Sequence, residues 1–185
     1  MKPTVEKLPP RIEIVPATRE QEPVVDNLLE LYAHDFSEFH NLVLGPTGRF
    51  GYKNLSLYWR DPHRHPFLIE VDGRLAGVVL VRTYPPSEGR DTFWDMAEFF
   101  IARGYRRNGV GTTVARRLWE RFPGRWEIRV MEANSVAHHF WQKTIAEFSG
   151  KEIESTRIEK AGVPWRLFSF DSRRFDSARR AIPGR

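Results

Sequence analysis

The chain has 185 residues, of which 41% are hydrophobic and 29% charged, and it contains no cysteine. This length and composition suit one globular domain, and the missing thiols exclude disulfides, thiolate metal sites and a cysteine nucleophile. No apolar run approaches the roughly 18 residues of a membrane span, and the N-terminal residues lack the apolar core of a signal peptide. We therefore expect a cytoplasmic protein that does not bind membranes.

The net charge of +5 is concentrated at the C-terminal end. Residues 173–185 hold five arginines and one aspartate, so they account for four of the five net charges. We expect a lead-in over residues 1–10, a single domain over residues 11–172 and a basic tail over residues 173–185. A solvated tail is favoured; the alternatives are contact with an acidic partner, RNA or a neighbouring subunit, as in a homodimer. For the domain itself we do not expect nucleic acid binding.

In the N-terminal half, hydrophobic spacing predicts one strand followed by helices. Residues 12–16 alternate as in a half-buried strand. Thr18 and Gln21 have the spacing of a capping box for a helix whose apolar face covers residues 24–32. A second helical segment, rich in aromatic and acidic residues, is expected over residues 35–44.

The remainder of the chain alternates between strand and helix patterns. Apolar runs on both sides of Asp72 and Gly73 predict a hairpin. Residues 93–101 are typical of a strand, and residues 151–159 and 165–170 are predicted to form the last hairpin.

One glycine-bearing loop, residues 106–112, lies between a strand-like run and an amphipathic helical segment. The N-terminus of a helix offers unpaired N–H groups and a partial positive charge, so this loop favours a phosphorylated ligand. It is not a P-loop, because Val110 stands where the lysine is required. Nor is it a dinucleotide fingerprint, because Val114 occupies the place of the third glycine.

The pattern that fits is R/Q-x-x-G-x-G/A, from Arg106 to Gly111. Downstream, after a strand-like run, residues 134–141 fit a second pattern, N-x-x-A-x-x-[LF]-[YWF], whose Asn134 is a suitable helix N-cap. With both motifs in this order, the chain resembles the GNAT superfamily of N-acetyltransferases. The resemblance implies an α/β fold with a mixed central sheet of about six or seven strands flanked by about four helices.

The resemblance also implies acetyl-CoA as acyl donor, with its pyrophosphate on the loop and its pantetheine arm along the preceding strand. The implied donor-site residues are Phe99, Phe100, Ile101, Arg103, Arg106, Arg107, Asn108, Gly109, Val110, Gly111, Thr112, Asn134 and Trp141. Asn134 can equally be a helix cap alone. Many GNAT members have a tyrosine where this chain has Trp141, and an indole cannot deliver a phenolic proton. Trp141 is therefore expected to pack beside the pantetheine or in the core, leaving Ser135, Tyr105, water or the substrate ammonium to protonate the thiolate.

An amine acceptor needs a base, and the strand before the loop carries two carboxylates, Asp95 and Glu98. Three residues apart, they point to opposite faces of a regular strand, so only a bulge would bring both to one cleft. Asp95 resembles, by its spacing to the loop, the base of the histone-acetylating branch. Glu98 is favoured because it lies closer to the expected thioester. Each could instead be a polar residue on a solvated strand face.

For the acceptor the resemblance points to the first helices, and the expected residues are Tyr32, Phe36 and Phe39. Aromatic faces can hold an ammonium, although aromatic residues at helical spacing are more often core. No metal site is expected, because His138 and His139 are adjacent on a helix and the chain lacks cysteine.

These patterns lead to an acyltransferase that moves the acetyl group of acetyl-CoA to a primary amine, of a small molecule or a peptide or protein, by direct attack in a ternary complex. The alternatives are a non-catalytic acyl-CoA-binding sensor with the same fold, and a nucleic-acid-associated module that uses the arginine tail.

Overall fold

A computed structural model describes residues 9–86 and 91–175. Its centre is a seven-stranded sheet in the order β1-β2-β3-β4-β5-β7-β6. The strands are β1 (Ile12–Pro16), β2 (Arg64–Val71), β3 (Arg74–Tyr84), β4 (Phe93–Ile101), β5 (Arg125–Met131), β6 (Thr156–Lys160) and β7 (Val163–Asp171). The helices are α1 (Glu22–Phe36), α2 (Val110–Arg121) and α3 (Ser135–Ser149), with short 3₁₀ helices η1 (Arg19–Gln21), η2 (Leu55–Trp59) and η3 (Arg103–Tyr105). The predicted mixed α/β architecture is confirmed.

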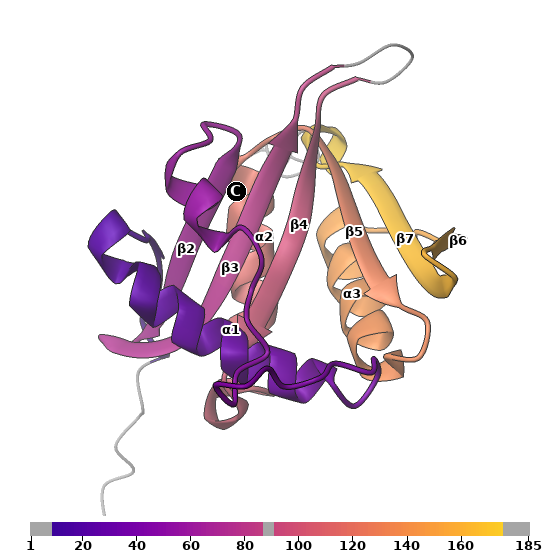
Figure 1. The fold of residues 1–185 in the computed structure, drawn as a ribbon. Coiled ribbons are helices and arrows are strands. Elements are labelled where there is room, and N and C mark those ends of the chain that lie inside the picture. Colours follow the sequence, from indigo (N-terminus) through magenta and orange to yellow (C-terminus); the bar gives the residue numbers. More distant parts are fainter. Residues whose placement is uncertain (1–8, 87–90, 176–185) are drawn as a thin grey trace, which may run out of the picture.

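Helices cover both faces of the sheet (Figure 1), and a hydrophobic cluster on each face holds them to it. On one face α2 and α3 pack around the buried indoles of Trp119 and Trp126. On the other face α1 and η2 cover β2, β3 and β4 through smaller apolar contacts that include Val25 and Leu80. Because both faces are covered, the central strands carry nearly continuous apolar runs, as at residues 76–81.

All neighbouring strands are antiparallel except β4 and β5, which are parallel. These two strands pair over only two positions, Trp94 with Trp126 and Asp95 with Glu127. Beyond them the strands diverge toward their C-terminal ends (Figure 1). Within residues 9–86 and 91–175, the C-terminal half of β4 therefore pairs with a strand on its β3 side only.

The hairpin between β2 and β3 forms as the Asp72–Gly73 pair predicts. Both residues have positive φ, 52° and 72°, which suits a two-residue turn between twisted strands. The predicted capping box also forms: the Thr18 N–H donates to the Gln21 side-chain oxygen at 2.9 Å.

The helix predicted over residues 35–44 is wrong. α1 continues to Phe36, and residues 37–44 contain no helix. After Phe36 the chain turns: the Phe39 N–H donates to the Phe36 carbonyl three residues back, and the Ser37 hydroxyl donates to the His34 carbonyl at 2.7 Å. Of the aromatic residues in this stretch, Phe36 thus belongs to the last turn of α1 and Phe39 to the segment after it.

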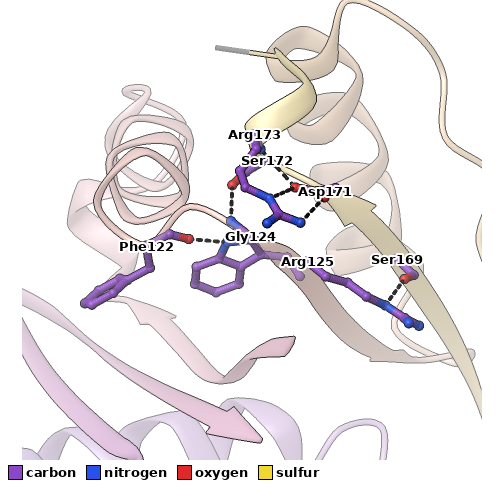
Figure 2. A network of polar contacts seen from close by, with 8 residues as sticks. Phe122, Gly124, Arg125, Ser169, Asp171, Ser172 and Arg173 are labelled. Carbon is purple, nitrogen blue, oxygen red and sulfur yellow. Dashed lines mark hydrogen bonds and ion pairs between the residues drawn. The ribbon is translucent and has the colours of Figure 1, made fainter. Parts of the chain in front are cut away.

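The connection from α2 to β5 is tied to the end of β7 (Figure 2). Gly124 and Ser172 exchange two hydrogen bonds, from the Gly124 N–H to the Ser172 hydroxyl and from the Ser172 N–H to the Gly124 carbonyl. The Trp126 indole N–H donates to the Phe122 carbonyl at 2.9 Å. These contacts fix the start of β5. Of the predicted basic tail, residues 176–185 lie outside the described residues.

Among the described residues, no helix is long and apolar enough to cross a bilayer.

Candidate active site

A β-bulge at Ala97 places the two candidate bases on one face of the sheet. In the β3–β4 register Glu98 lies opposite Leu80 but Met96 lies opposite Val81, so Ala97 is the extra residue. This shift turns Asp95 to the same side as Glu98. Both carboxylates therefore face the α1 and η2 layer, the arrangement that only a bulge allows.

Glu98 is partly buried and surrounded by hydroxyl groups. The Tyr52 hydroxyl donates to Glu98 Oε1 at 2.8 Å, and Tyr32 on α1 hydrogen-bonds the same side chain. Burial raises the pKa of Glu98 to about 7, against the opposing effects of the two tyrosine hydrogen bonds and the Arg82 charge. A carboxyl group with this pKa exchanges protons near neutral pH.

Asp95 is only 1% exposed and has a cation as its partner. Arg129 Nη2 on β5 lies 2.7 Å from Asp95 Oδ2. Burial raises the pKa of Asp95, while the charges of Arg129 and Arg82 oppose that rise. Asp95 is thus part of an ion pair that joins β4 to β5 at their short parallel contact.

The C-terminal part of α1 forms an aromatic wall beside Glu98. The ring centroids of Tyr32 and Phe36 are 5.7 Å apart, and those of Phe36 and Trp165 on β7 are 6.5 Å apart. The Tyr32 ring also lies 6.1 Å from that of Phe100 on β4, so this row of rings connects β4 to β7. Of the three predicted acceptor residues, Tyr32 and Phe36 lie in the row, and Phe39 follows the end of α1 with its N–H on the Phe36 carbonyl.

The predicted phosphate loop has an open helix N-terminus. α2 begins at Val110 after Gly109, which has a φ of 74° and no side chain to cap the helix. Thr113 donates its N–H to the Gly109 carbonyl at 3.0 Å, so the preceding N–H groups lie outside the intrahelical ladder. No acidic side chain occupies the first turn. Arg107, Asn108 and Gly109 are exposed to solvent.

Gly111 and Thr112 form the first turn of α2, against α3. A Cβ atom on Gly111 would lie 3.2 Å from the Phe140 ring, so the two helices approach closely at this position. The Thr112 and Thr144 hydroxyls are 3.4 Å apart.

Two arginines of the predicted donor site form ion pairs with one carboxylate, that of Asp35. Arg103 Nη2 lies 2.7 Å from Asp35 Oδ1, and Arg106 Nη2 lies 2.6 Å from Asp35 Oδ2. Arg106 Nε also donates to the Ile101 carbonyl at 2.6 Å. These pairs tie the loop to the last turn of α1, and they hold both guanidinium groups on the α1 side.

The other predicted donor residues are divided between the two core layers. Phe99 faces α3, with its ring centroid 4.9 Å from that of Trp141, whereas Phe100 belongs to the α1 layer. Trp141 itself is 6% exposed. Asn134 caps α3, accepting the Ala137 N–H at 2.9 Å on its side-chain oxygen.

The sequence of residues 25–145 matches the model of the Acetyltransferase (GNAT) family. The chain belongs to the GNAT acetyltransferase family. GNAT enzymes are acyltransferases that use acetyl-CoA as co-substrate. No curated protein matches the chain in sequence.

Solved structures show the same GNAT fold at low sequence identity. An acetyltransferase from Thermus thermophilus has a TM-score of 0.59 at 18% identity, covering 86% of this chain and 96% of that one. Arabidopsis thaliana NAA60, in complex with a bisubstrate analogue, has a TM-score of 0.57 at 13% identity, covering 87% and 98%. A spermidine N-acetyltransferase chimera of Vibrio cholerae SpeG and hSSAT has a TM-score of 0.54 at 13% identity, covering 90% and 98%.

Three side chains around the site of this GNAT protein make contacts that sequence reasoning did not predict. Arg82 donates from Nε to the Tyr58 hydroxyl at 2.9 Å, Asp35 binds the loop arginines, and Trp165 completes the aromatic row. A signal for Arg82 was available, because it is the first charged residue after the seven apolar or small residues 75–81 that follow the predicted hairpin turn. No local pattern marks the other two.

Proposed function

We propose that this GNAT acetyltransferase moves the acetyl group of acetyl-CoA to a primary amine by direct attack in a ternary complex, with Glu98 as general base. The acceptor is a small molecule or a peptide or protein amine. The observation that supports this assignment most is the position of Glu98, on the bulged strand beside Tyr32 and Tyr52, with a pKa raised by burial to about 7.

The chemistry requires a proton acceptor, and a carboxyl group with a pKa of about 7 is ionised just above neutral pH. An alkyl ammonium has a pKa of about 10.4 and must lose a proton before its nitrogen can attack the thioester carbonyl carbon. Glu98 would take that proton. Burial raises the pKa of both tyrosines, so their hydroxyls stay protonated and serve as hydrogen-bond donors. The aromatic row of Tyr32 and Phe36 supports an acceptor site beside this base.

The donor side fits a phosphorylated carrier. The uncapped start of α2 supplies backbone N–H groups and the positive end of the helix dipole, which suit a diphosphate. The edge of β4 that faces away from β3 supplies main-chain groups beyond Asp95 for an amide-bearing arm. Phosphate contact by Arg103 or Arg106 would require exchange of the Asp35 carboxylate, so we assign the phosphates first to the N–H groups.

The departing thiolate needs no tyrosine at residue 141. A thiol has a pKa of about 8.5, so its anion is a far better leaving group than an amine anion. Trp141, packed against the rings of Phe99 and Phe140, supports a packing role beside the donor.

The first test is a thermal shift with acetyl-CoA, with free adenine nucleotides and NAD as comparison ligands. Donor at about 100 times its Kd should stabilise the protein by about 2.7 kcal/mol. Thiol release is then measured over primary amines that include polyamines, amino acids and peptides. Binding without release from any amine would favour the non-catalytic sensor. No stabilisation by acetyl-CoA would contradict the proposal.

A matched pair of variants tests the helix terminus. Gly109→Asp and Gly109→Asn place side chains of equal size at the same positive-φ position, where both residues are tolerated. Only the aspartate puts negative charge where the phosphates would bind. We expect Gly109→Asp to weaken acetyl-CoA binding at least tenfold more than Gly109→Asn. Equal affinities of the two variants would place the phosphates elsewhere.

A further inference from the structure

Arg82 stands on the face of the sheet that carries both carboxylates. It follows the apolar run of β3 and lies opposite Asp95 in the β3–β4 register. Its guanidinium donates from Nε to the Tyr58 hydroxyl at 2.9 Å and from Nη2 to the Tyr52 hydroxyl at 3.4 Å. A permanently charged side chain thus contacts the hydroxyls of both Tyr52 and Tyr58.

The geometry fixes the direction of the next hydrogen bond. A tyrosine hydroxyl has one proton, and a guanidinium is a donor that cannot accept. Tyr52 therefore accepts from Arg82, and its only proton points to Glu98 Oε1, 2.8 Å away. The result is a directed series of contacts from Arg82 through Tyr52 to Glu98.

We propose that Arg82 is a positioning residue for the general base Glu98 and acts through the hydroxyl of Tyr52. This inference rests on the proposed function. The directed hydrogen bond and the positive charge both favour the carboxylate form of Glu98, the form that accepts the ammonium proton. The charged and titratable groups around Glu98 are Tyr32 on α1, Tyr52 before η2, Tyr58 on η2, Arg82 on β3 and Asp95 on β4.

The test compares the pH dependence of kcat/KM in the wild type and in Arg82→Gln. The wild-type rate should fall as pH drops through about 7, where Glu98 is protonated. Without the guanidinium this acid limb should move upward by about one pH unit, so the variant loses roughly tenfold below pH 7 and recovers above pH 9. A loss that is equal at every pH would overturn the inference, because it would indicate a structural role alone.

A second arginine provides the matched control. The Arg64 guanidinium carbon lies 5.3 Å from the Tyr58 ring centroid, close to the 6.0 Å of Arg82, but Arg64 is paired with Asp61. Arg64→Gln removes an arginine from the same tyrosine ring and should leave the acid limb in place. An equal shift in both variants would also overturn the inference.

Two further variants examine the route through Tyr52. Arg82→Lys keeps the positive charge but lacks the planar set of guanidinium donors. Its acid limb should lie between those of the wild type and Arg82→Gln. If Arg82→Gln does not fold, Arg82→Lys takes its place in the comparison with the wild type. In a Tyr52→Phe background, Arg82→Gln should shift the limb less than it does in the wild type. A full shift in that background would mean that Arg82 acts without Tyr52.

A readout independent of turnover separates this inference from the proposed function. In protein labelled with [5-¹³C]glutamate, the Glu98 resonance is identified by its loss in Glu98→Gln and is then titrated by NMR. Arg82→Gln should raise the titration midpoint of that resonance by about one pH unit. If the midpoint moves but no amine is acetylated, the proposed function is contradicted, whereas the effect of Arg82 on Glu98 through Tyr52 is supported. If amines are acetylated and the midpoint is unchanged, Arg82 is not the positioning residue.

Discussion

Asp95 and Glu98 lie three residues apart on one strand and face the same side of the sheet, yet their partners differ in kind. Burial raises the pKa of both. Asp95 is held by the Arg129 cation, whereas Glu98 accepts hydrogen bonds from neutral tyrosine hydroxyls. A fixed cation favours the carboxylate form, and neutral donors leave a carboxyl group free to gain and lose a proton. The partners, more than the depth of burial, support the proposal that Glu98 is the base and that Asp95 has a structural role.

The largest expected effect comes from neutralising the base. Glu98→Gln keeps the size of the side chain and removes the proton acceptor, so kcat/KM should fall by about 10² to 10⁴ at pH 7.5. Asp95→Asn should cost about tenfold or less, because its role is structural. The measurement is thiol release with a responsive amine, and acetyl-CoA affinity is the control. A larger loss in Asp95→Asn would reverse the assignment.

The structural role of Asp95 is tested by removing its cationic partner, Arg129. Arg129→Ala leaves Asp95 buried without its ion partner, which should lower the free energy of unfolding by about 3 kcal/mol at pH 8. At pH 4 the loss should be smaller, because an Asp95 whose pKa is already raised takes up a proton. Urea unfolding at both pH values measures this. Arg157→Ala breaks the exposed pair with Glu132 and should change the stability by less than about 1 kcal/mol.

A third prediction concerns stability rather than rate. The pKa of Glu98 is about 7 in the folded protein and 4.5 for the ordinary side chain. A raised pKa contributes stability that is present below pH 4.5 and is lost as pH rises through 7. Glu98→Gln does not ionise, so its melting temperature should exceed that of the wild type at pH 8.5 by an amount that disappears near pH 4.5. The difference corresponds to about 2 to 3 kcal/mol. A gap that is constant with pH would contradict it.

The smallest effect is expected at the second tyrosine. Tyr32→Phe removes one hydrogen bond that favours the Glu98 carboxylate, so the acid limb should move up and the rate at pH 7 should fall about threefold. Tyr84→Phe is the control, since that ring stacks on Phe93 far along β3 from Leu80 and Glu98. A rate loss in Tyr32→Phe with an unmoved acid limb would mean that Tyr32 serves the acceptor alone.

Most of the fold could be predicted from local patterns. Period-two alternation identifies the edge strand before Ala17, and the Asp72–Gly73 turn fixes one hairpin. The position of Asn134 before an amphipathic run predicts a cap, and its side chain does cap α3. Each of these features depends on residues that are neighbours in sequence, so a single sequence contains the information.

The site could be predicted only in part, because its decisive contacts are long-range. The bulge at Ala97 has no glycine or proline to mark it in the sequence, because it depends on how β4 pairs with β3. Asp35 meets Arg103 and Arg106 across 68 and 71 residues, and Tyr52 meets Glu98 across 46. No periodicity relates residues at such distances. The sequence therefore identified the two carboxylates as candidates, and the geometry that distinguishes them came from the fold.

The short pairing of β4 with β5 has a consequence for deuterium exchange. Main-chain amides of residues 97–101 that do not bond to β3 have no acceptor on another of the described strands, so they should exchange early in the free protein. A pantetheine arm lying along this edge would act as a missing strand and slow them. Slower deuterium exchange of these β4 amides would thus show that the donor site is occupied, without any knowledge of the amine acceptor.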